Sequence, residues 1–417
     1  MRVLGVGLRV YLGALYQALA REGHEVRIHA AHPAVQRSFR GMVDTVEDWR
    51  AELPWVGRDG VVMFETVGQG AVQDELRGAG YRVVGGSAFG DRLEHDRPFG
   101  QALLARAGVR VAAMHPFSGT DEAAGWLRAH PGRYVLKHDD NAGTTFVGAH
   151  SEGADVLHVL GRRTGRVSLM ELVTGTEVGI GAYFDGRRFL RPACIDFEHK
   201  RFFPGDLGEM TGEMGTLAGF HGSERLFEAT LGQVEGALAA ADHVGYVNVN
   251  LIVNRDGVWP LEFTCRFGNP GFAVLAPLQL DGWGDLLGRM AGLVPCDTFR
   301  TSPDWSVAIV LTAPPFPIHR PTAPETDDLP MFFTEPPDPG HFFPIDVRRD
   351  GEQMFVRAVS GHAAVVTGTG PDVQAARKAA RRRAESVVVP DLRWRGDIGE
   401  RFERFDGAHL RGLGWIP

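Results

Sequence analysis

The feature that most constrains this chain is a strand–turn–strand pattern near residues 246–264 that leads into charged residues. Residues 246–254 form an apolar strand pattern, Asp256-Gly257 is typical of a tight hairpin turn, and the return strand reads WPLEF. Glu262 and Arg266 therefore follow closely on the return strand, beside a Gly-Asn-Pro loop. Because a carboxylate on a buried strand is costly unless it meets a cation, we interpret Glu262 as a candidate ligand for magnesium that carries nucleotide phosphates.

The first 90 residues alternate between strand and helix patterns. Strands are predicted at 1–7, 24–30, 59–66 and 81–87, and Leu12, Leu15, Tyr16 and Leu19 mark one face of an intervening helix. This order predicts a small parallel α/β sheet. The pair Gly5 and Gly7 lacks the third glycine and the later acid of a dinucleotide-binding motif, so we expect a loop that starts a helix or touches a substrate phosphate.

Later segments mix helices with antiparallel strands. Helices are predicted at 93–108, 121–130 and 372–386, and strands at 109–114, 133–140, 167–173 and 363–370. Hairpins with Asp-Gly turns are predicted around residues 182–190 and 350–351, besides the one at 256–257. An apolar stripe over 227–241 predicts a helix that faces the core.

Composition excludes several classes of function. The net charge of −8 provides no general attraction for nucleic acid or an anionic membrane. The three cysteines lack metal-ligand spacing, and no apolar run reaches 18 residues. We therefore expect a cytoplasmic protein with small-molecule substrates, monomeric or homodimeric. The basic stretch 377–383 predicts a solvated helix face, or alternatively a surface that holds an anionic acceptor such as a nucleotide or nucleic acid.

Lys137 is the main candidate for a contact with phosphate. It ends an apolar strand and is followed by the loop Asn141-Ala142-Gly143-Thr144-Thr145. A lysine beside a loop of small residues with free backbone N–H groups suits the charge and shape of a triphosphate. A surface lysine before a turn remains the alternative for this motif taken alone.

Several motifs occur together in one order along the chain. They are Lys137 with its loop, Glu171-Leu172-Val173 before Thr174-Gly175-Thr176-Glu177, then Glu198-His199-Lys200-Arg201, Thr211-Gly212-Glu213-Met214-Gly215 and the segment 259–272. Taken together, they resemble the ATP-grasp ligases, and most closely the phosphoribosylamine–glycine ligase family. The resemblance implies an α/β ATP-grasp fold with a Rossmann-like domain at 1–92, an ATP-grasp domain at 93–312 with a lid near 108–172, and a small α/β domain at 313–417.

The resemblance also implies roles for individual residues. Glu171 and Val173 would meet adenine through their backbone, and Glu177 would meet the ribose hydroxyls. The phosphates would be held by Arg97, Lys137, Gly143 and Thr144. Glu262 would bind Mg²⁺, or Mn²⁺, with help from Thr264 or Asn250. Arg266, Lys200 and His199 would serve the substrates as catalytic residues, with an ordinary structural role as the alternative for Lys200 and His199.

The chain departs from the family pattern at several functional positions. Arg97 stands in place of a lysine, and Thr264 in place of an asparagine that shares the metal. The loop after the first strand reads Gly5-Val6-Gly7-Leu8-Arg9 and lacks the Arg-Glu-His trio with which the family holds phosphoribosylamine. A changed amine pocket beside a retained nucleotide site predicts a different amine acceptor, and Arg9 is a candidate contact for its phosphate or nucleobase.

The resulting prediction is an ATP-dependent carboxylate–amine ligase that forms an amide through an acyl phosphate and releases ADP and phosphate. It would join glycine or another small amino acid to an amine other than phosphoribosylamine, such as a modified nucleotide or a specialised metabolite. Two alternatives stay open: an authentic phosphoribosylamine–glycine ligase of purine biosynthesis, and a nucleotide-binding protein without catalysis.

Overall fold

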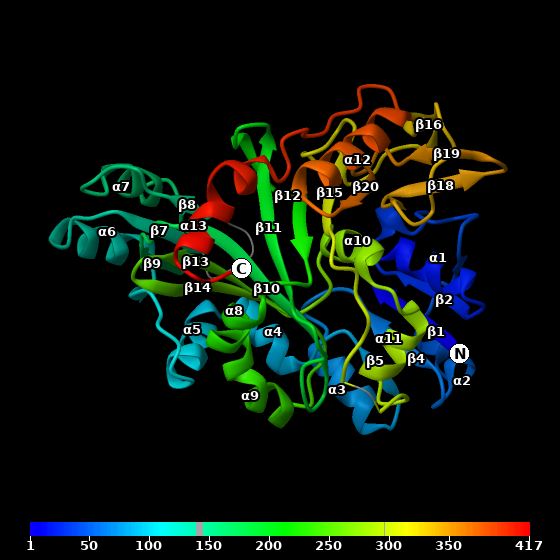
Figure 1. Ribbon diagram of the computed structural model, residues 1–417, viewed down its shortest axis with the longest axis horizontal. Helices are drawn as coiled ribbons and strands as arrows, with labels where there is room; N and C mark the ends of the chain where they lie inside the picture. Colours follow the sequence, from blue (N-terminus) through cyan, green and yellow to red (C-terminus); the bar gives the residue numbers. More distant parts are fainter. Residues whose placement is uncertain (139–144, 296) are drawn as a thin grey trace.

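The computed structural model describes residues 1–138, 145–295 and 297–417. Its strands form four sheets, joined and covered by helices (Figure 1). The N-terminal sheet lies at one side of the molecule and a small sheet with its two helices lies at the other. The long strands of a central antiparallel sheet run between them. In this view the elements between residues 329 and 386 lie above the N-terminal sheet, whereas the last helix, at 407–412, lies beside the central strands.

The N-terminal sheet has the strand order β3-β2-β1-β4-β5, and all its pairs are parallel. Its strands are β1 (Arg2–Gly7), β2 (Glu25–Ala30), β3 (Asp44–Thr45), β4 (Val61–Phe64) and β5 (Arg82–Val84). Its helices are α1 (Gly13–Arg21), α2 (Leu53–Val56) and α3 (Gly70–Gly78). The predicted parallel α/β layer is therefore confirmed. Its chain order reverses between β1 and β4, and ligands of open α/β sheets bind at such a point.

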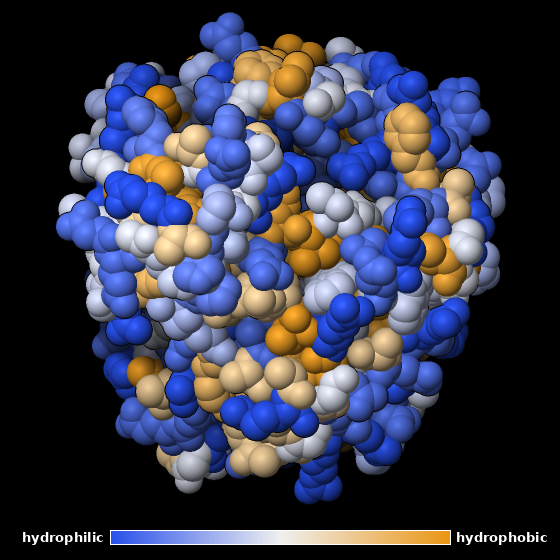
Figure 2. All heavy atoms as spheres, turned by 90° about the vertical axis from the view of Figure 1, so that its left-hand side faces the viewer, coloured by the Kyte–Doolittle hydropathy of each residue, from blue (hydrophilic) through white to orange (hydrophobic). Residues whose placement is uncertain are grey.

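A second, four-stranded sheet has the order β6-β9-β7-β8. Its strands are β6 (Met114–Phe117), β7 (Tyr134–His138), β8 (Phe146–Val147) and β9 (Val167–Glu171). Helices α6 (Thr120–Ala129) and α7 (Ala154–Leu160) pack on it through a core of their own around Leu127, Leu136 and Leu169. Figure 2 shows the end of the molecule that carries this sheet, where the surface is largely hydrophilic with hydrophobic side chains toward its centre.

The central sheet has eight strands in the order β14-β13-β10-β11-β12-β15-β20-β17. They are β10 (Thr176–Asp185), β11 (Cys194–Phe203), β12 (Leu207–Gly219), β13 (Val244–Asn254), β14 (Gly257–Thr264), β15 (Trp305–Thr312), β17 (Phe342–Pro344) and β20 (His362–Gly370). The predicted hairpin with the Asp256-Gly257 turn is β13–β14. Because β15 pairs with β20, one sheet continues across residue 312, where the sequence predicts a domain boundary.

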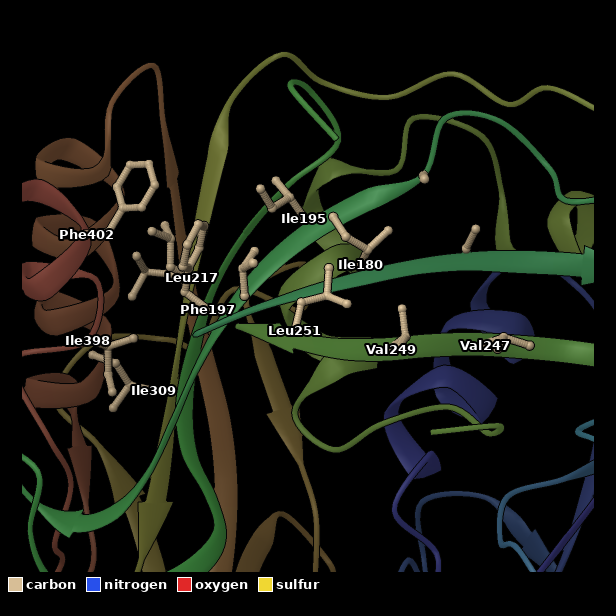
Figure 3. Close-up of a cluster of buried hydrophobic side chains, with 14 of the residues drawn as sticks. Ile180, Ile195, Phe197, Leu217, Val247, Val249, Leu251, Ile309, Ile398 and Phe402 are labelled. Atoms are coloured by element: carbon tan, nitrogen blue, oxygen red, sulfur yellow. The ribbon is translucent and has the colours of Figure 1, made fainter. Parts of the chain in front are cut away.

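The two faces of this sheet differ because successive side chains of a strand point to opposite sides. Ile195 and Phe197 of β11 lie with Val249 of β13 in a fully apolar cluster (Figure 3). The alternate residues Asp196 and Asn250 face the other side and are buried polar side chains. One face is therefore core, and the other carries the polar groups described below.

The remaining elements surround this sheet. The helices are α4 (Ala88–His95), α5 (Arg97–Arg106), α8 (Glu224–Ala229), α9 (Glu235–Ala240), α10 (Gly271–Leu275), α11 (Trp283–Met290), α12 (Val373–Ser386) and α13 (Gly407–Gly412). The strands β16 (Leu329–Phe333), β18 (Val347–Asp350), β19 (Gln353–Val356) and β21 (Val387–Val388) form the fourth sheet. The described residues contain no helix long and apolar enough to cross a bilayer.

Some predicted elements differ in the structure. The helix predicted over 93–108 is divided into α4 and α5, because the Asp96 side chain accepts a hydrogen bond from Phe99 N and Pro98 follows at the start of a new helix. The strand predicted at 109–114 was wrong in position, since β6 begins only at Met114. The helix predicted over 227–241 is interrupted at Thr230, where α8 ends.

Candidate active site

Three cationic side chains converge on Glu262 at the end of β14. Arg97, the first residue of α5, donates from Nε and Nη2 to Glu262 Oε2 at 3.2 and 3.0 Å. Lys137 Nζ on β7 lies 3.8 Å from the same oxygen, and Lys200 Nζ on β11 lies 4.0 Å from Oε1. Residues 97, 137, 200 and 262, which lie far apart in sequence, are thus brought together.

This clustering changes the proton affinity of its members. Burial by itself would raise the pKa of Glu262, but the charges of Lys137, Lys200 and Arg97 hold that pKa at about 2. Burial lowers the pKa of Lys137 to about 8, although Glu262 acts in the opposite direction. Glu262 is therefore fully ionised at neutral pH. With three cations around one carboxylate, this end of the site attracts anions.

Lys200 lies among three carboxylates. Its Nζ is 3.0 Å from Glu198 Oε2, 3.5 Å from Glu177 Oε1 and 4.0 Å from Glu262 Oε1. Burial would lower the pKa of Lys200, but these carboxylates raise it, so the side chain is a fixed cation. Asn250 Nδ2 also donates to Glu198 Oε2, at 3.1 Å. Asn250 is therefore placed beside the cluster, opposite Glu262 in the β13–β14 register.

The residues predicted to meet adenine and ribose lie at the end of β9, in the link that follows it, and on β10. Glu171 is the exposed last residue of β9, and Val173 lies in the partly buried link that follows. Glu177, on β10, reaches Lys200. Gly143 and Thr144, predicted to hold phosphate, lie outside the described residues.

Two predicted catalytic residues lie away from the cluster. His199 shares the apolar face of β11 with Phe197, is 7% exposed, and its Nε2 accepts a hydrogen bond from Gly399 N at 3.3 Å. The strand alternation that presents Lys200 to the site thus turns His199 to the opposite side, and its prediction as a catalytic residue is not supported by this placement. Arg266 follows β14 and donates from Nε to Glu94 Oε1 at 3.2 Å.

A cavity adjoins the cluster on the polar face of the sheet. It holds about 400 Å³ of space, part of it open to solvent. Its lining joins alternate residues of β11 and β13 to residues of β12, β14, the turn after β14 and α10: Cys194, Asp196, Glu198, Glu213, Thr216, Tyr246, Asn248, Thr264, Gly268, Gly271, Val274 and Leu275. Thr264, predicted as a metal ligand, is thus part of the wall.

Sequence reasoning missed the acidic members of this cavity, Asp196 and Glu213. A usable signal was present in the intervening strand β10, where Gly179 and Gly181 alternate. A Cβ at residue 179 would collide with Asp196 Oδ1, and one at 181 would collide with the Tyr246 hydroxyl. The glycines therefore leave room for side chains of β11 and β13 to meet across β10.

The donor set fits a divalent ion that is brought with a nucleotide. Among the described residues no group of three or more histidines, cysteines and acids is arranged to hold a metal alone. Magnesium is commonly held by one or two carboxylates, with phosphate and water oxygens as its other ligands. Glu262 supplies an ionised carboxylate, and Glu198 lies across Lys200 from it. The Lys200 ammonium here occupies the position of a cation between carboxylates.

Comparison with known sequences identifies the central part of the chain. Residues 95–272 match the family model of the ATP-grasp (A) domain of phosphoribosylglycinamide synthetase. The chain is 24% identical over 363 residues to phosphoribosylamine–glycine ligase of Neisseria meningitidis serogroup B, covering 82% of this chain and 84% of the relative. It is 27% identical over 341 residues to the Streptomyces coelicolor enzyme of the same name, covering 79% and 80%.

Solved structures show the same fold. Phosphoribosylamine–glycine ligase from Thermotoga maritima superposes with a TM-score of 0.74 at 20% identity, covering 95% of this chain and all of that one. A biotin carboxylase from Campylobacter jejuni, solved as a complex with an ATP compound, superposes with a TM-score of 0.65 at 11% identity, covering 98% of each chain. Residues 95–272 thus match an ATP-grasp domain, and the chain as a whole is similar in sequence and fold to phosphoribosylamine–glycine ligases.

Proposed function

We propose that this protein joins a carboxylate to an amine while ATP is cleaved to ADP and phosphate, and that the amine is not phosphoribosylamine. The observation that carries the ligase reaction is the convergence of Arg97, Lys137 and Lys200 on Glu262. An ionised carboxylate surrounded by buried cations has the charge pattern of a site for polyphosphate with its counter-ion.

Each residue of the cluster has a distinct role in this reaction. Lys137 and Arg97 bind the phosphates, and Lys200 balances the charge of the transferred group. When bound at Glu262, a divalent ion draws electron density from the terminal phosphate. The substrate carboxylate attacks that phosphate to form an acyl phosphate and ADP. The amine then attacks the acyl carbon, and phosphate leaves.

A different acceptor is supported by the structure of the loop after β1. In this loop Arg9 and Tyr11 line a small pocket together with Asp346, whose carboxylate accepts hydrogen bonds from Ser38 and Ser360. Arg9 and Tyr11 thus belong to the loop in which the family carries its Arg-Glu-His trio.

Glu65 follows β4 and lies at the same edge of the N-terminal sheet as the loop after β1. Its Oε2 accepts a hydrogen bond from Leu12 N at 3.0 Å, and burial raises its pKa to about 7. Glu65 thereby caps the chain before α1. The Glu65 carboxylate therefore has a structural role at the sheet edge where an open sheet of this type offers a ligand site.

The names of the relatives favour the second candidate, an authentic phosphoribosylamine–glycine ligase. Thr264 in place of an asparagine favours the third, a nucleotide-binding protein without catalysis. These candidates differ in what they turn over, so one assay separates them.

The assay is ADP release from ATP and magnesium across a matrix of amino acids and amines, including glycine with freshly made phosphoribosylamine. We expect turnover with a pair whose amine is not phosphoribosylamine, and mass spectrometry then identifies the amide. Turnover with glycine and phosphoribosylamine alone would establish the second candidate. ATP binding with no ADP release in any combination would establish the third.

A further inference from the structure

The cavity beside the phosphate cluster contains carboxylates that the ligase reaction as described does not use. Asp196 and Glu213 line it from β11 and β12. Asp196 is 7% exposed, and its Oδ2 accepts a hydrogen bond from Asn248 Nδ2 at 2.7 Å. Glu213 Oε1 accepts one from the Thr216 hydroxyl. The second oxygen of each carboxylate accepts no hydrogen bond from any described residue.

Neither carboxylate forms an ion pair with a described cation, although the charge of Lys200 lowers the pKa of both groups and that of Arg266 lowers the pKa of Glu213. Lys200 is already engaged by Glu198, Glu177 and Glu262, and Arg266 is paired with Glu94. Burial and the charge of Glu198 raise the pKa of Asp196 to about 7. Burial and the charges of Glu198 and Asp196 also raise the pKa of Glu213 well above its usual range. As ions, these two carboxylates would face one cavity with no ion-pair partner among the described residues.

The arrangement favours an ammonium ion over a metal as the missing partner. The described residues offer no group of three or more histidines, cysteines and acids spaced for a metal. An ammonium group has three N–H donors on one nitrogen, which matches carboxylate oxygens of two strands that face one space. Asn248 and Tyr246 add an amide and a phenol to the polar part of the lining. Val274 and Leu275 supply apolar surface for the carbon atoms of a ligand.

We infer that this cavity binds the protonated amine of a substrate, with Asp196 and Glu213 as the residues that recognise its charge. The inference rests on the proposed ligase function and specifies its substrate class. Glu198 connects the two ends, because it lines the cavity and also contacts Lys200. A substrate can thus place an anionic or acyl end near the phosphates and its cationic end between Asp196 and Glu213.

An ammonium group can come from the carboxylate substrate or from the amine acceptor, so the test needs both arms. Calorimetric titrations of the full-length protein, preloaded with magnesium and ADP, compare L-alanine with L-lactate and butylamine with butan-1-ol. Each pair differs in whether an ammonium or a hydroxyl is present. The proteins are wild type, Asp196→Asn, Glu213→Gln, and Glu209→Gln as a matched control on the exposed part of β12.

In wild type we expect the ammonium member of at least one pair to bind about tenfold more tightly, since hydrogen bonds to charged groups have about this effect. The preference should fall to about threefold or less in Asp196→Asn and Glu213→Gln, and should persist in Glu209→Gln. The alanine arm responding alone assigns the cavity to the carboxylate substrate, and the butylamine arm assigns it to the acceptor.

Equal binding of both members of each pair in wild type would overturn the inference. A preference that survives in both cavity variants would also overturn it, because another part of the chain would then recognise the charge. ADP affinity, measured for every variant before the titration, reports that the variant is folded. The two claims are separable: a wild-type protein that releases ADP with a substrate pair but shows no ammonium preference contradicts the inference alone.

Discussion

The two ends of this site make opposite use of charge. At the phosphate end, Arg97, Lys137 and Lys200 surround the single carboxylate of Glu262. Asp196, further back on β11, and Glu213, on the neighbouring strand β12, line a cavity and form no ion pair with a described cation. Both ends lie on one face of the central sheet.

The difference shows how one sheet can hold two ligands of opposite charge. In β11 the residues that face the site change from Asp196 and Glu198 to Lys200 within five positions. Lys200 therefore lies between the cations Arg97 and Lys137 and the cavity that Asp196 and Glu213 line. In the proposed reaction this charge pattern would orient a substrate, with its anionic end at the nucleotide and its cationic end in the cavity.

The strongest way to break the phosphate end is Glu262→Gln. This change removes the ionised carboxylate and leaves three cations without their counter-charge. We expect ADP release with magnesium to fall about 100-fold or more. ATP binding in the presence of a chelator should be unchanged or tighter. A variant with nearly normal turnover would contradict the role of Glu262, and Glu209→Gln serves as the control.

The pH dependence of ATP use sharpens the role of Lys137. Its pKa of about 8 means that it is charged below pH 8 and loses its charge above it. Because kcat/KM reports the free enzyme, kcat/KM for ATP should fall above pH 8, by up to about tenfold for each pH unit. In Lys137→Arg the fall should move to higher pH, since a guanidinium stays charged. The same profile in both proteins would exclude Lys137 as its origin.

Crowding the cavity floor tests the acidic end. In Gly179→Ala the new Cβ would collide with Asp196 Oδ1, so we expect a loss of about 2 kcal/mol in the free energy of unfolding. Urea denaturation measures this. Gly212→Ala on β12 is the matched control, because a Cβ there meets nothing within 4 Å. Equal stability of the two variants would contradict the close approach across β10.

The smallest expected effect concerns the ionisation of Asp196. The folded chain holds a proton up to pH 7, whereas an unfolded chain releases it near pH 4, so this group lowers stability as pH rises from about 4 through 7. Asp196→Asn lacks this cost. The thermal midpoint of the variant relative to wild type should therefore rise by about 1 to 3 °C between pH 5 and pH 8. A difference independent of pH would contradict the raised pKa.

Much of the fold could be predicted from local sequence patterns. The alternation of strands and helices before residue 90 and the Asp256-Gly257 hairpin depend on neighbouring residues, and the structure confirms both. The continuity of β15 with β20 depends on contacts between distant segments, which neither periodicity nor turn residues encode.

The charged residues of recognisable motifs could be predicted as site residues. Residues whose role depends on which face of a strand they occupy were missed or misassigned. Lys137, Lys200 and Glu262 were identified from their motifs and lie together. His199, in the same motif as Lys200, faces the core because adjacent strand residues alternate. Asp196 could have been found only by combining the glycines of β10 with the polar residues of β11. These two strands are neighbours in the sheet, and the sequence alone does not give that order.

The most direct test of the account follows an oxygen atom. With a substrate pair that supports ADP release, the carboxylate substrate is labelled with ¹⁸O in both oxygens, and the released phosphate is analysed by mass spectrometry. The account predicts one ¹⁸O atom in each phosphate, because the carboxylate attacks the terminal phosphate and one of its oxygens leaves with phosphate when the amine attacks. Phosphate without the label would contradict an acyl phosphate and with it the proposed ligase reaction.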